Sequence, residues 1–209
     1  MPLNTFVPYG EMAIWVGFDG DGSTDVVQSG TNYEVWPMAM LVGSPWVFVY
    51  AYAWAEVFPA AATGQSIIPF VGDEMRVAVW IDNIGPAGSP SIPNGYAHME
   101  TMNLITLNYS DTVVPISKLG ISATEAEWIV EAPAKLTNDG VTSVQTPLAQ
   151  FANFEIIAAF CERRSDSTVK GWSEEDDKRV IWMVKNNRFC SLCGPDAPWQ
   201  MRFVWLNAQ

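Results

Sequence analysis

The sequence predicts an all-β protein, a two-sheet antiparallel β-sandwich formed by a single domain over residues 1–209. Three observations lead to this fold class. Short β-rich segments alternate with Gly, Pro, Asn and Asp residues, and no long amphipathic helical period interrupts them. The length of 209 residues and the hydrophobic fraction of 49% are enough to bury the core of one large all-β domain. Regularly spaced strands favour two packed sheets over two small domains.

The individual strands are predicted from runs of β-branched and aromatic residues bounded by turn-forming residues. They are expected at residues 13–18, 25–36, 47–58, 66–70, 74–82, 98–109, 126–131, 151–160, 179–186 and 201–207. Residues 82–95 are rich in Pro and Gly and are expected to form a long hairpin connection, with an interdomain linker as the alternative.

Composition excludes several classes of function. The chain has 11 Lys and Arg against 23 Asp and Glu, a formal charge of −12, and its basic residues form no run, so no nucleic acid partner is expected. No stretch approaches the roughly 18 apolar residues of a membrane span, and the N-terminus shows no signal peptide, so we expect no membrane partner. His98 is the only histidine, which argues against a His-based zinc site and a Ser-His-Asp triad. We expect His98 at the surface, and no metal or other cofactor.

The three cysteines leave alternatives open. Cys190 and Cys193 have the CSLC spacing of a short-loop disulfide, of free thiols, or of half a zinc site without a second half, and Cys161 lies apart from them. An odd and low number of cysteines does not indicate a redox compartment.

One predicted strand carries aromatic and acidic residues on the same face. Alternation puts Trp54, Glu56 and Phe58 on one face of residues 47–58 and small or apolar residues on the other. Apolar walls with few polar groups suit the floor of a groove for an extended polymeric substrate. The alternative is that these aromatics fill the space between the sheets.

A second strand, AEWIVE at residues 126–131, carries Glu127, Ile129 and Glu131 on one face. Two carboxylates bracketed by apolar residues cost desolvation energy unless one is neutral or hydrogen-bonded. Such an environment can convert a carboxyl group into a titrating base.

From about residue 7 to about residue 160 the chain resembles the eqolisins, or glutamic peptidases. The resemblance rests on this strand and on other motifs that occur in the same order as in the family, namely WVGFDG, VVQSG, AWAEVFP and IIPFVGDEMRVAVW. The resemblance implies a β-sandwich of the concanavalin A-like lectin and glucanase type, with a concave groove. It also implies a catalytic pair, Gln28 and Glu131, with Trp15, Asp19 and Glu56 at positions that line or support the site. Trp54, on the groove face of residues 47–58, is expected to bind substrate with them. Glu127 begins the same motif, but the family pattern selects Glu131.

The resemblance implies an acid-acting endopeptidase, metal-independent and insensitive to pepstatin, that binds an extended polypeptide as a monomer. Hydrolysis without a metal or a nucleophile needs a base for water and a donor for the oxyanion, which Glu131 and Gln28 respectively can supply. Family members are secreted, so an extracellular location is expected, with an intracellular one left open. Two alternatives are a carbohydrate-active or carbohydrate-binding sandwich that uses Glu56 and Glu131, and a non-catalytic relative of the peptidase fold.

Overall fold

The structure is a computed structural model of the chain. It describes residues 10–19, 23–37, 47–83, 85, 95–121, 125–136, 143–149, 154–157, 160–163, 168–171, 184–185, 188–189, 191–197 and 200–205. The chain divides into two compact units, Met1–Ala149 and Gln150–Gln209, which are described separately. The expectation of one domain over the whole chain stays a prediction.

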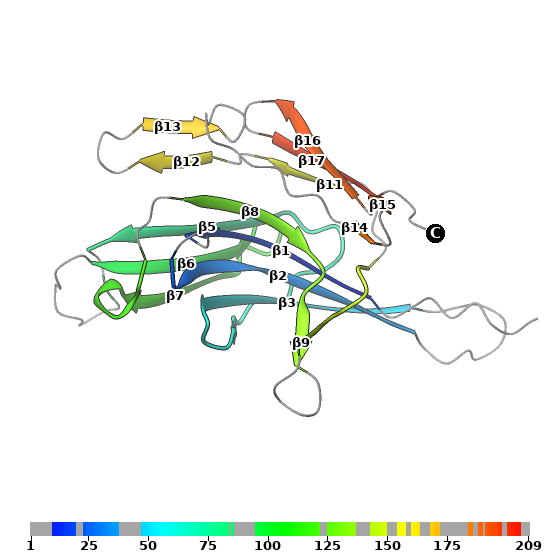
Figure 1. Ribbon diagram of the computed structural model, residues 1–209, viewed down its shortest axis with the longest axis horizontal. Helices are drawn as coiled ribbons and strands as arrows, with labels where there is room; N and C mark the ends of the chain where they lie inside the picture. Colours follow the sequence, from blue (N-terminus) through cyan, green and yellow to red (C-terminus); the bar gives the residue numbers. More distant parts are fainter. Residues whose placement is uncertain are drawn as a thin grey trace, which may run out of the picture. The chain divides into compact units, whose positions relative to one another are not determined.

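The first unit contains two antiparallel sheets (Figure 1). One has five strands in the order β4-β3-β2-β1-β8, and the other has three in the order β5-β6-β7. A small sheet pairs β10 with β9. The strands are β1 (Gly10–Phe18), β2 (Val26–Pro37), β3 (Val47–Phe58), β4 (Thr63–Gly64), β5 (Met75–Asp82), β6 (Tyr96–Asn103), β7 (Tyr109–Pro115), β8 (Ala126–Glu131), β9 (Ala134–Leu136) and β10 (Ser143–Gln145), and the 3-10 helix η1 (Ile116–Lys118) follows β7.

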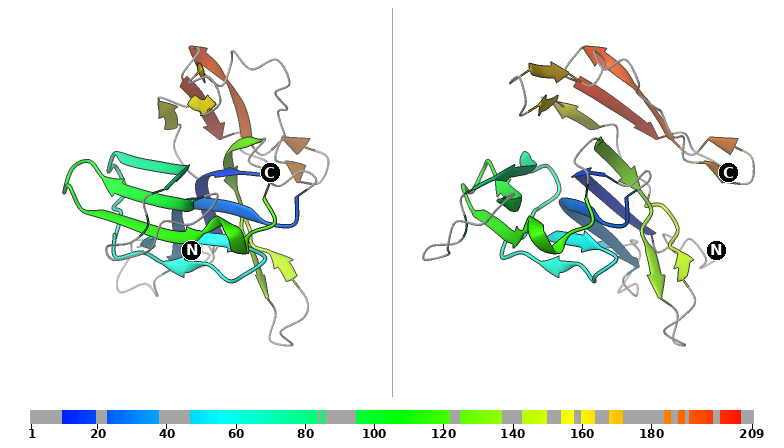
Figure 2. Two further views of the ribbon diagram at one scale, coloured as in Figure 1. Left: turned by 90° about the vertical axis from the view of Figure 1, so that its left-hand side faces the viewer. Right: turned by 60° about the vertical axis from the view of Figure 1, so that its left-hand side comes forward.

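The two larger sheets pack face to face, and Figure 2 shows them as separate layers. Their shared core contains buried apolar side chains from both sheets, namely Phe18, Val27, Ala55, Ala97 and Met99. Because strand residues alternate between faces, the neighbours of these core residues point to the opposite face of each sheet. The predicted antiparallel β-sandwich is therefore confirmed.

Most predicted strands of this unit are also confirmed. The strands expected at 47–58 and 126–131 have the bounds of β3 and β8, and those at 13–18, 25–36 and 74–82 correspond to β1, β2 and β5. Strands β5 and β6 pair antiparallel up to Asp82 opposite Tyr96, so residues 82–95 connect a hairpin as expected.

The strand predicted at 66–70 is wrong. These residues are irregular, although Ile67 is buried and its carbonyl accepts a hydrogen bond from the N–H of Ala53. Pro69 has no N–H to give to a neighbouring strand, and the next N–H, of Phe70, donates to the Asp73 carboxylate in a turn. The apolar residues here pack against the sheet without joining it.

The single strand predicted at 98–109 is also wrong, because a hairpin interrupts it. The Asn103 side-chain oxygen accepts hydrogen bonds from the N–H groups of Ile105 (2.9 Å) and Thr106 (3.0 Å). This local bonding turns the chain between β6 and β7, a use of asparagine that competes with strand pairing. The sequence prediction missed β7 for this reason.

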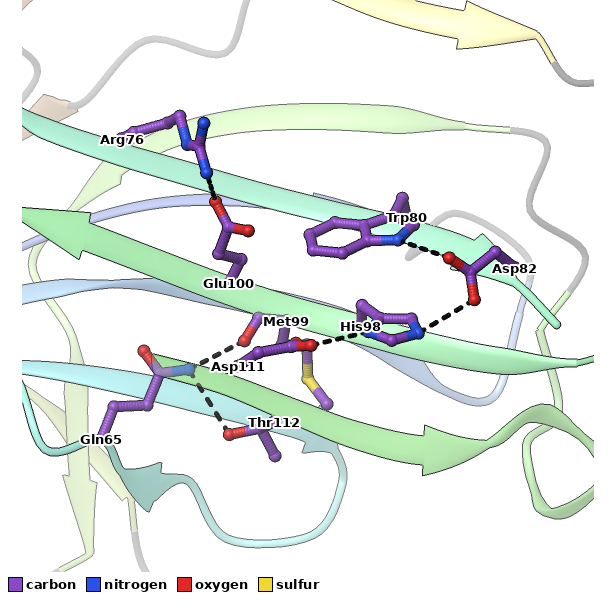
Figure 3. Close-up of polar contacts among 9 residues, drawn as sticks. All are labelled: Gln65, Arg76, Trp80, Asp82, His98, Met99, Glu100, Asp111 and Thr112. Atoms are coloured by element: carbon purple, nitrogen blue, oxygen red, sulfur yellow. Dashed lines mark hydrogen bonds and ion pairs between the residues drawn. The ribbon is translucent and has the colours of Figure 1, made fainter. Parts of the chain in front are cut away.

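His98 is buried, contrary to the expected surface position. It lies on β6, the central strand of the three-stranded sheet, and is 5% exposed. Its Nδ1 is 2.7 Å from Oδ2 of Asp111 and its Nε2 is 3.1 Å from Oδ1 of Asp82 (Figure 3). Trp80 stacks on the imidazole ring with centroids 4.8 Å apart. Side chains from both neighbouring strands therefore cover a position that seemed polar and exposed in the sequence.

The second unit also consists of antiparallel pairs, in the sheets β11-β17-β16, β12-β13 and β14-β15. Its strands are β11 (Phe154–Ile157), β12 (Phe160–Arg163), β13 (Thr168–Gly171), β14 (Val184–Lys185), β15 (Arg188–Phe189), β16 (Ser191–Ala197) and β17 (Gln200–Trp205). The single strand predicted at 151–160 corresponds to β11 and the start of β12, and most of the strand predicted at 179–186 lies outside the described residues. Cys190 lies outside them too, so pairing of Cys190 with Cys193 stays a prediction.

Candidate active site

Strand pairing in the five-stranded sheet brings the sequence motifs together on the face opposite the core. Residues that pair across β8, β1, β2 and β3 form rows on this face, which we call the Gln28 row, the tryptophan row and the Glu131 row. The Gln28 row contains Glu127, Gly17, Gln28 and Glu56. The tryptophan row contains Ile129, Trp15, Gly30 and Trp54, and continues to Gly64 on β4. The Glu131 row contains Glu131, Ala13, Asn32 and Tyr52.

Gln28 lies on β2, between β1 and β3, and is 7% exposed. Its amide Nε2 donates a hydrogen bond to Oε2 of Glu56, which is directly opposite on β3. A buried amide needs such a partner, because an unsatisfied polar group in the interior costs free energy.

Glu131 lies at the end of β8 and is half-buried. Its Oε1 accepts a hydrogen bond of 3.1 Å from the indole Nε1 of Trp15. Burial raises the pKa of the Glu131 carboxyl, and the bond from Trp15 offsets only part of that rise. The carboxyl group is therefore a stronger base than an exposed glutamate.

Glu56 has a similarly perturbed carboxyl group. Burial is the main cause that raises its pKa, the hydrogen bond from Gln28 lowers it, and the negative charge of Glu131 raises it further. Glu56 and Glu131 therefore interact electrostatically across this face, although they lie on β3 and β8.

Trp15 links the Gln28 row with the Glu131 row. A Cβ atom placed on Gly17 would lie 3.1 Å from Cζ3 of Trp15 and 3.2 Å from Cβ of Gln28, so the benzene end of the indole approaches Gln28. The other end of the indole donates to Glu131. The indole thus extends from the position of Gly17, which pairs directly with Gln28, to a hydrogen bond with Glu131.

Two glycines make room for this tryptophan. Gly17 has no side chain where the indole and Gln28 meet, and a Cβ on Gly30 would lie 2.5 Å from both the carbonyl oxygen of Ile14 and Cβ of Trp15. Sequence reasoning missed both residues. A glycine inside a strand indicates a close approach of other groups, and this signal was present in WVGF and VVQSG.

The remaining predicted site residues lie close to these rows. Trp54 is buried in the tryptophan row, beside Gly30. Asp19 follows the end of β1, is 1% exposed, has a positive φ of 63°, and donates its N–H to the carbonyl of Glu125 at 3.0 Å. The structure therefore brings five of the six predicted residues to one sheet face, and Asp19 to the end of the strand that carries Trp15.

The described residues contain no group of three or more His, Cys, Asp or Glu side chains arranged to hold a metal ion. Within the same residues no helix has the length and hydropathy needed to cross a membrane. The chemical groups on the face are carboxyls, the buried amides of Gln28 and Asn32, the phenol of Tyr52 and indoles, a set that can transfer protons and stabilise developing charge.

Solved structures similar to this chain include several glutamic peptidases. Aspergilloglutamic peptidase from Aspergillus niger has a TM-score of 0.69 at 19% identity, over 94% of this chain and 99% of that one. Scytalidoglutamic peptidase with a peptide-based transition state analog has a TM-score of 0.72 at 19% identity, over 94% and 84%. SCP-B, an eqolisin in complex with the tripeptide Ala-Ile-His, has a TM-score of 0.59 at 18% identity, over 94% and 83%. These similarities show a shared fold.

A comparison with curated proteins finds none that matches this chain. The model of the peptidase A4 family, in contrast, matches residues 5–196, which is most of the sequence. The chain therefore belongs to the peptidase A4 family, the eqolisins, as the resemblance of its motifs indicated.

Proposed function

We propose that this protein is an acid-acting endopeptidase in which Glu131 and Gln28 form the catalytic pair. The observation that carries the proposal is the arrangement on the five-stranded sheet, where both side chains share one face and the Trp15 indole extends from beside Gln28 to a hydrogen bond with Glu131. Membership of a peptidase family supports hydrolysis of peptide bonds.

In the proposed reaction Glu131 acts first as a general base. Its carboxylate takes a proton from water while the water oxygen bonds to the scissile carbonyl carbon. The same carboxyl then delivers that proton to the leaving nitrogen as the carbon–nitrogen bond breaks. The raised pKa of Glu131 suits both steps, because its ionised form is a better base than an ordinary glutamate and its neutral form persists closer to neutrality.

Gln28 stabilises the negative charge that develops on the carbonyl oxygen. A buried amide N–H is a fixed dipole in surroundings of low polarity, where its hydrogen bond to an oxyanion is stronger than in water. Removal of one such donor costs about 3 to 4 kcal/mol of transition-state stabilisation in known cases.

The proposed substrate is an extended polypeptide. Similar proteins of known structure hold a peptide-based transition state analog in one case and the tripeptide Ala-Ile-His in another. On this chain Trp15 and Trp54 flank Gly30, so an aromatic residue lies on either side of a position without a side chain. We further propose that the enzyme is a monomer and works outside the cell. It needs no metal, and pepstatin, which blocks aspartic peptidases, does not inhibit it.

The test is hydrolysis of denatured casein from pH 3 to pH 7, in the presence of pepstatin and of a chelator. Cleavage that resists both agents is expected, and Gln28→Ala and Glu131→Gln should each lower kcat by on the order of a hundredfold or more while the fold is retained. Wild-type rates in a folded Glu131→Gln protein would exclude the assignment. Release of sugar from β-glucan without cleavage of casein would favour the carbohydrate-active alternative instead.

A further inference from the structure

The orientation of the Gln28 amide is a separate question from its presence in the site. A glutamine amide has an NH₂ group, which donates, and an oxygen, which accepts, and the two ends have nearly the same shape. Its hydrogen-bond partners alone decide which end faces which neighbour. For an oxyanion donor this matters, because a reversed amide would present an oxygen to the developing negative charge.

On one side of Gln28 the neighbouring position on β1 is Gly17, which has no side chain. On the other side the directly opposed residue on β3 is Glu56, and its Oε2 accepts the hydrogen bond from Nε2 of Gln28. The two positions directly adjacent to Gln28 in its row therefore offer the amide one polar side chain, that of Glu56, and Glu127 is the next residue beyond Gly17.

An ionised carboxylate accepts hydrogen bonds and donates none. Glu56 in this form fixes the NH₂ end of Gln28 toward β3, because the reversed amide would set its oxygen against a negatively charged oxygen. Hydrogen bonds with one charged partner are roughly twice as strong as those between neutral groups. One N–H of the amide is held by Glu56, and the second N–H stays available for another acceptor.

We propose that Glu56 is a positioning residue that fixes the orientation of the Gln28 amide and thereby aims its second N–H at the substrate carbonyl. The inference rests on the proposed function for its catalytic meaning, whereas the orientation itself is a property of the folded protein. Glu56 acts through Gln28 and exchanges no proton with the substrate.

The protonation of Glu56 follows from the groups that face it. Burial and the charge of Glu131 on β8 raise its pKa, the bond from Gln28 on β2 lowers it, and Glu127 lies in the same row beyond Gly17. As the pH falls through this raised pKa, Glu56 gains an O–H and becomes a donor as well as an acceptor. Either orientation of the amide is then supported, so Glu56 controls the amide only above its own pKa.

The test compares Glu56→Gln with a matched control, Glu34→Gln. The first variant keeps the shape of residue 56 but supplies both a donor and an acceptor, so it supports both orientations of Gln28. Glu34 lies on the same strand as Gln28, has the Trp36 indole as a hydrogen-bond donor, and pairs with Tyr50 rather than with Glu56. Its substitution removes a carboxylate from β2 at a position that pairs with none of the predicted site residues.

The primary measurement is the side-chain NH₂ signal of Gln28 in ¹⁵N-labelled protein, identified by its absence from Gln28→Glu. In the wild type and in Glu34→Gln, one of the two protons is expected downfield and protected from exchange. Both features should be lost in Glu56→Gln, and also in the wild type on acidification through the pKa of Glu56. Identical Gln28 signals in the wild type and in Glu56→Gln would overturn the proposal. The acid titration tests the same point if the variant does not fold.

Kinetics give the second measurement. At a pH above the pKa of Glu56, equal population of two orientations would halve kcat, and the loosened amide should bring the total loss in Glu56→Gln to on the order of tenfold, with KM within about twofold of the wild type. A loss as large as that of Glu131→Gln, with unchanged Gln28 signals, would make Glu56 itself a proton-transfer group and overturn its positioning role. Absence of peptidase activity in the wild type would refute the proposed function, whereas the NMR result would still decide the orientation.

Discussion

At the scale of single residues, the face is organised around Trp15 and the space left for it. Gly17 and Gly30 allow the indole to lie against the sheet, where it approaches Gln28 with one end and binds Glu131 with the other. The geometry of the proposed catalytic pair thus depends on residues that carry no reactive group.

The bond from Trp15 to Glu131 predicts a shift in pH dependence. This bond lowers the pKa of Glu131 against the larger effect of burial, so Trp15→Phe should raise that pKa further. Because the proposed base acts in its ionised form, the acid limb of the kcat/KM profile should move to higher pH. Trp36→Phe is the control, because the Trp36 indole is exposed and donates to Glu34. An unchanged acid limb in Trp15→Phe would mean that Glu131 does not set it.

The tight contact at Gly30 predicts a loss of stability. The methyl group of Gly30→Ala would lie 2.5 Å from a backbone oxygen and from Cβ of Trp15, so β1 and β2 must shift. Overpacking of this kind costs about 1 to 3 kcal/mol, which urea unfolding would measure. Gly64→Ala is the matched control in the same row, because its methyl group would meet nothing within 4 Å. Equal unfolding midpoints for the two variants would contradict the crowding argument.

At the scale of elements, His98 connects the three strands of the second sheet. Its two ring nitrogens face carboxylates on β5 and β7, and both can donate only when the ring is doubly protonated. Hydrogen bonds to charged groups contribute about 1.5 to 3 kcal/mol each, so these contacts should stabilise the pairing of β6 with β5 and β7.

His98→Phe tests this connection, because phenylalanine keeps a ring against Trp80 but has no N–H group. The variant should be less stable than the wild type by about 1.5 to 3 kcal/mol for each lost bond, which urea unfolding would measure. Equal unfolding midpoints in both proteins would show that the contacts of His98 do not stabilise the sheet.

The elements also show what could be predicted from the sequence. Alternation was sufficient for β3, where aromatic and small side chains alternate, and for β8, and it placed Trp54 with Glu56 on one face of β3 and Glu127 with Glu131 on one face of β8. It failed at Asn103, where a side chain bonds to the next two N–H groups, and at Ile67, which is buried without strand pairing. The alternation of side chains along a strand does not show when a side chain will bond to the backbone of its own turn. It also does not show which residues from distant strands will cover a position. The bond between Gln28 and Glu56 and the burial of His98 depend on strand order for the same reason.

At the scale of the whole molecule, the net charge and the buried carboxyls both favour greater stability of the fold in acid than at neutral pH. The chain has a formal charge of −12, which is self-repulsive at neutral pH. Glu56 and Glu131 have raised pKa values in the folded state, so the fold binds their protons more tightly than the unfolded chain does. Their contribution to stability is present in acid and is lost as the pH rises through the raised values.

We therefore expect urea unfolding midpoints to be higher at pH 4 than at pH 8. The double variant Glu56→Gln, Glu131→Gln should reduce the difference, because neither residue then titrates. Greater stability of the wild type at pH 8 would contradict this expectation.

The burial of Gln28 also bears on how long the enzyme would last in the conditions proposed for it. Acid slowly hydrolyses carboxamides, and glutamine is among the chemically labile residues. Conversion of residue 28 to glutamate would replace the proposed oxyanion donor by a third acidic group beside Glu56 and Glu131, and would end turnover without unfolding the chain. With only 7% of the residue accessible to solvent, few water molecules reach that carbonyl carbon. The packing around one amide would thus protect the proposed catalytic group from the acid medium proposed for it, and the working lifetime of the enzyme in acid becomes a measure of that packing.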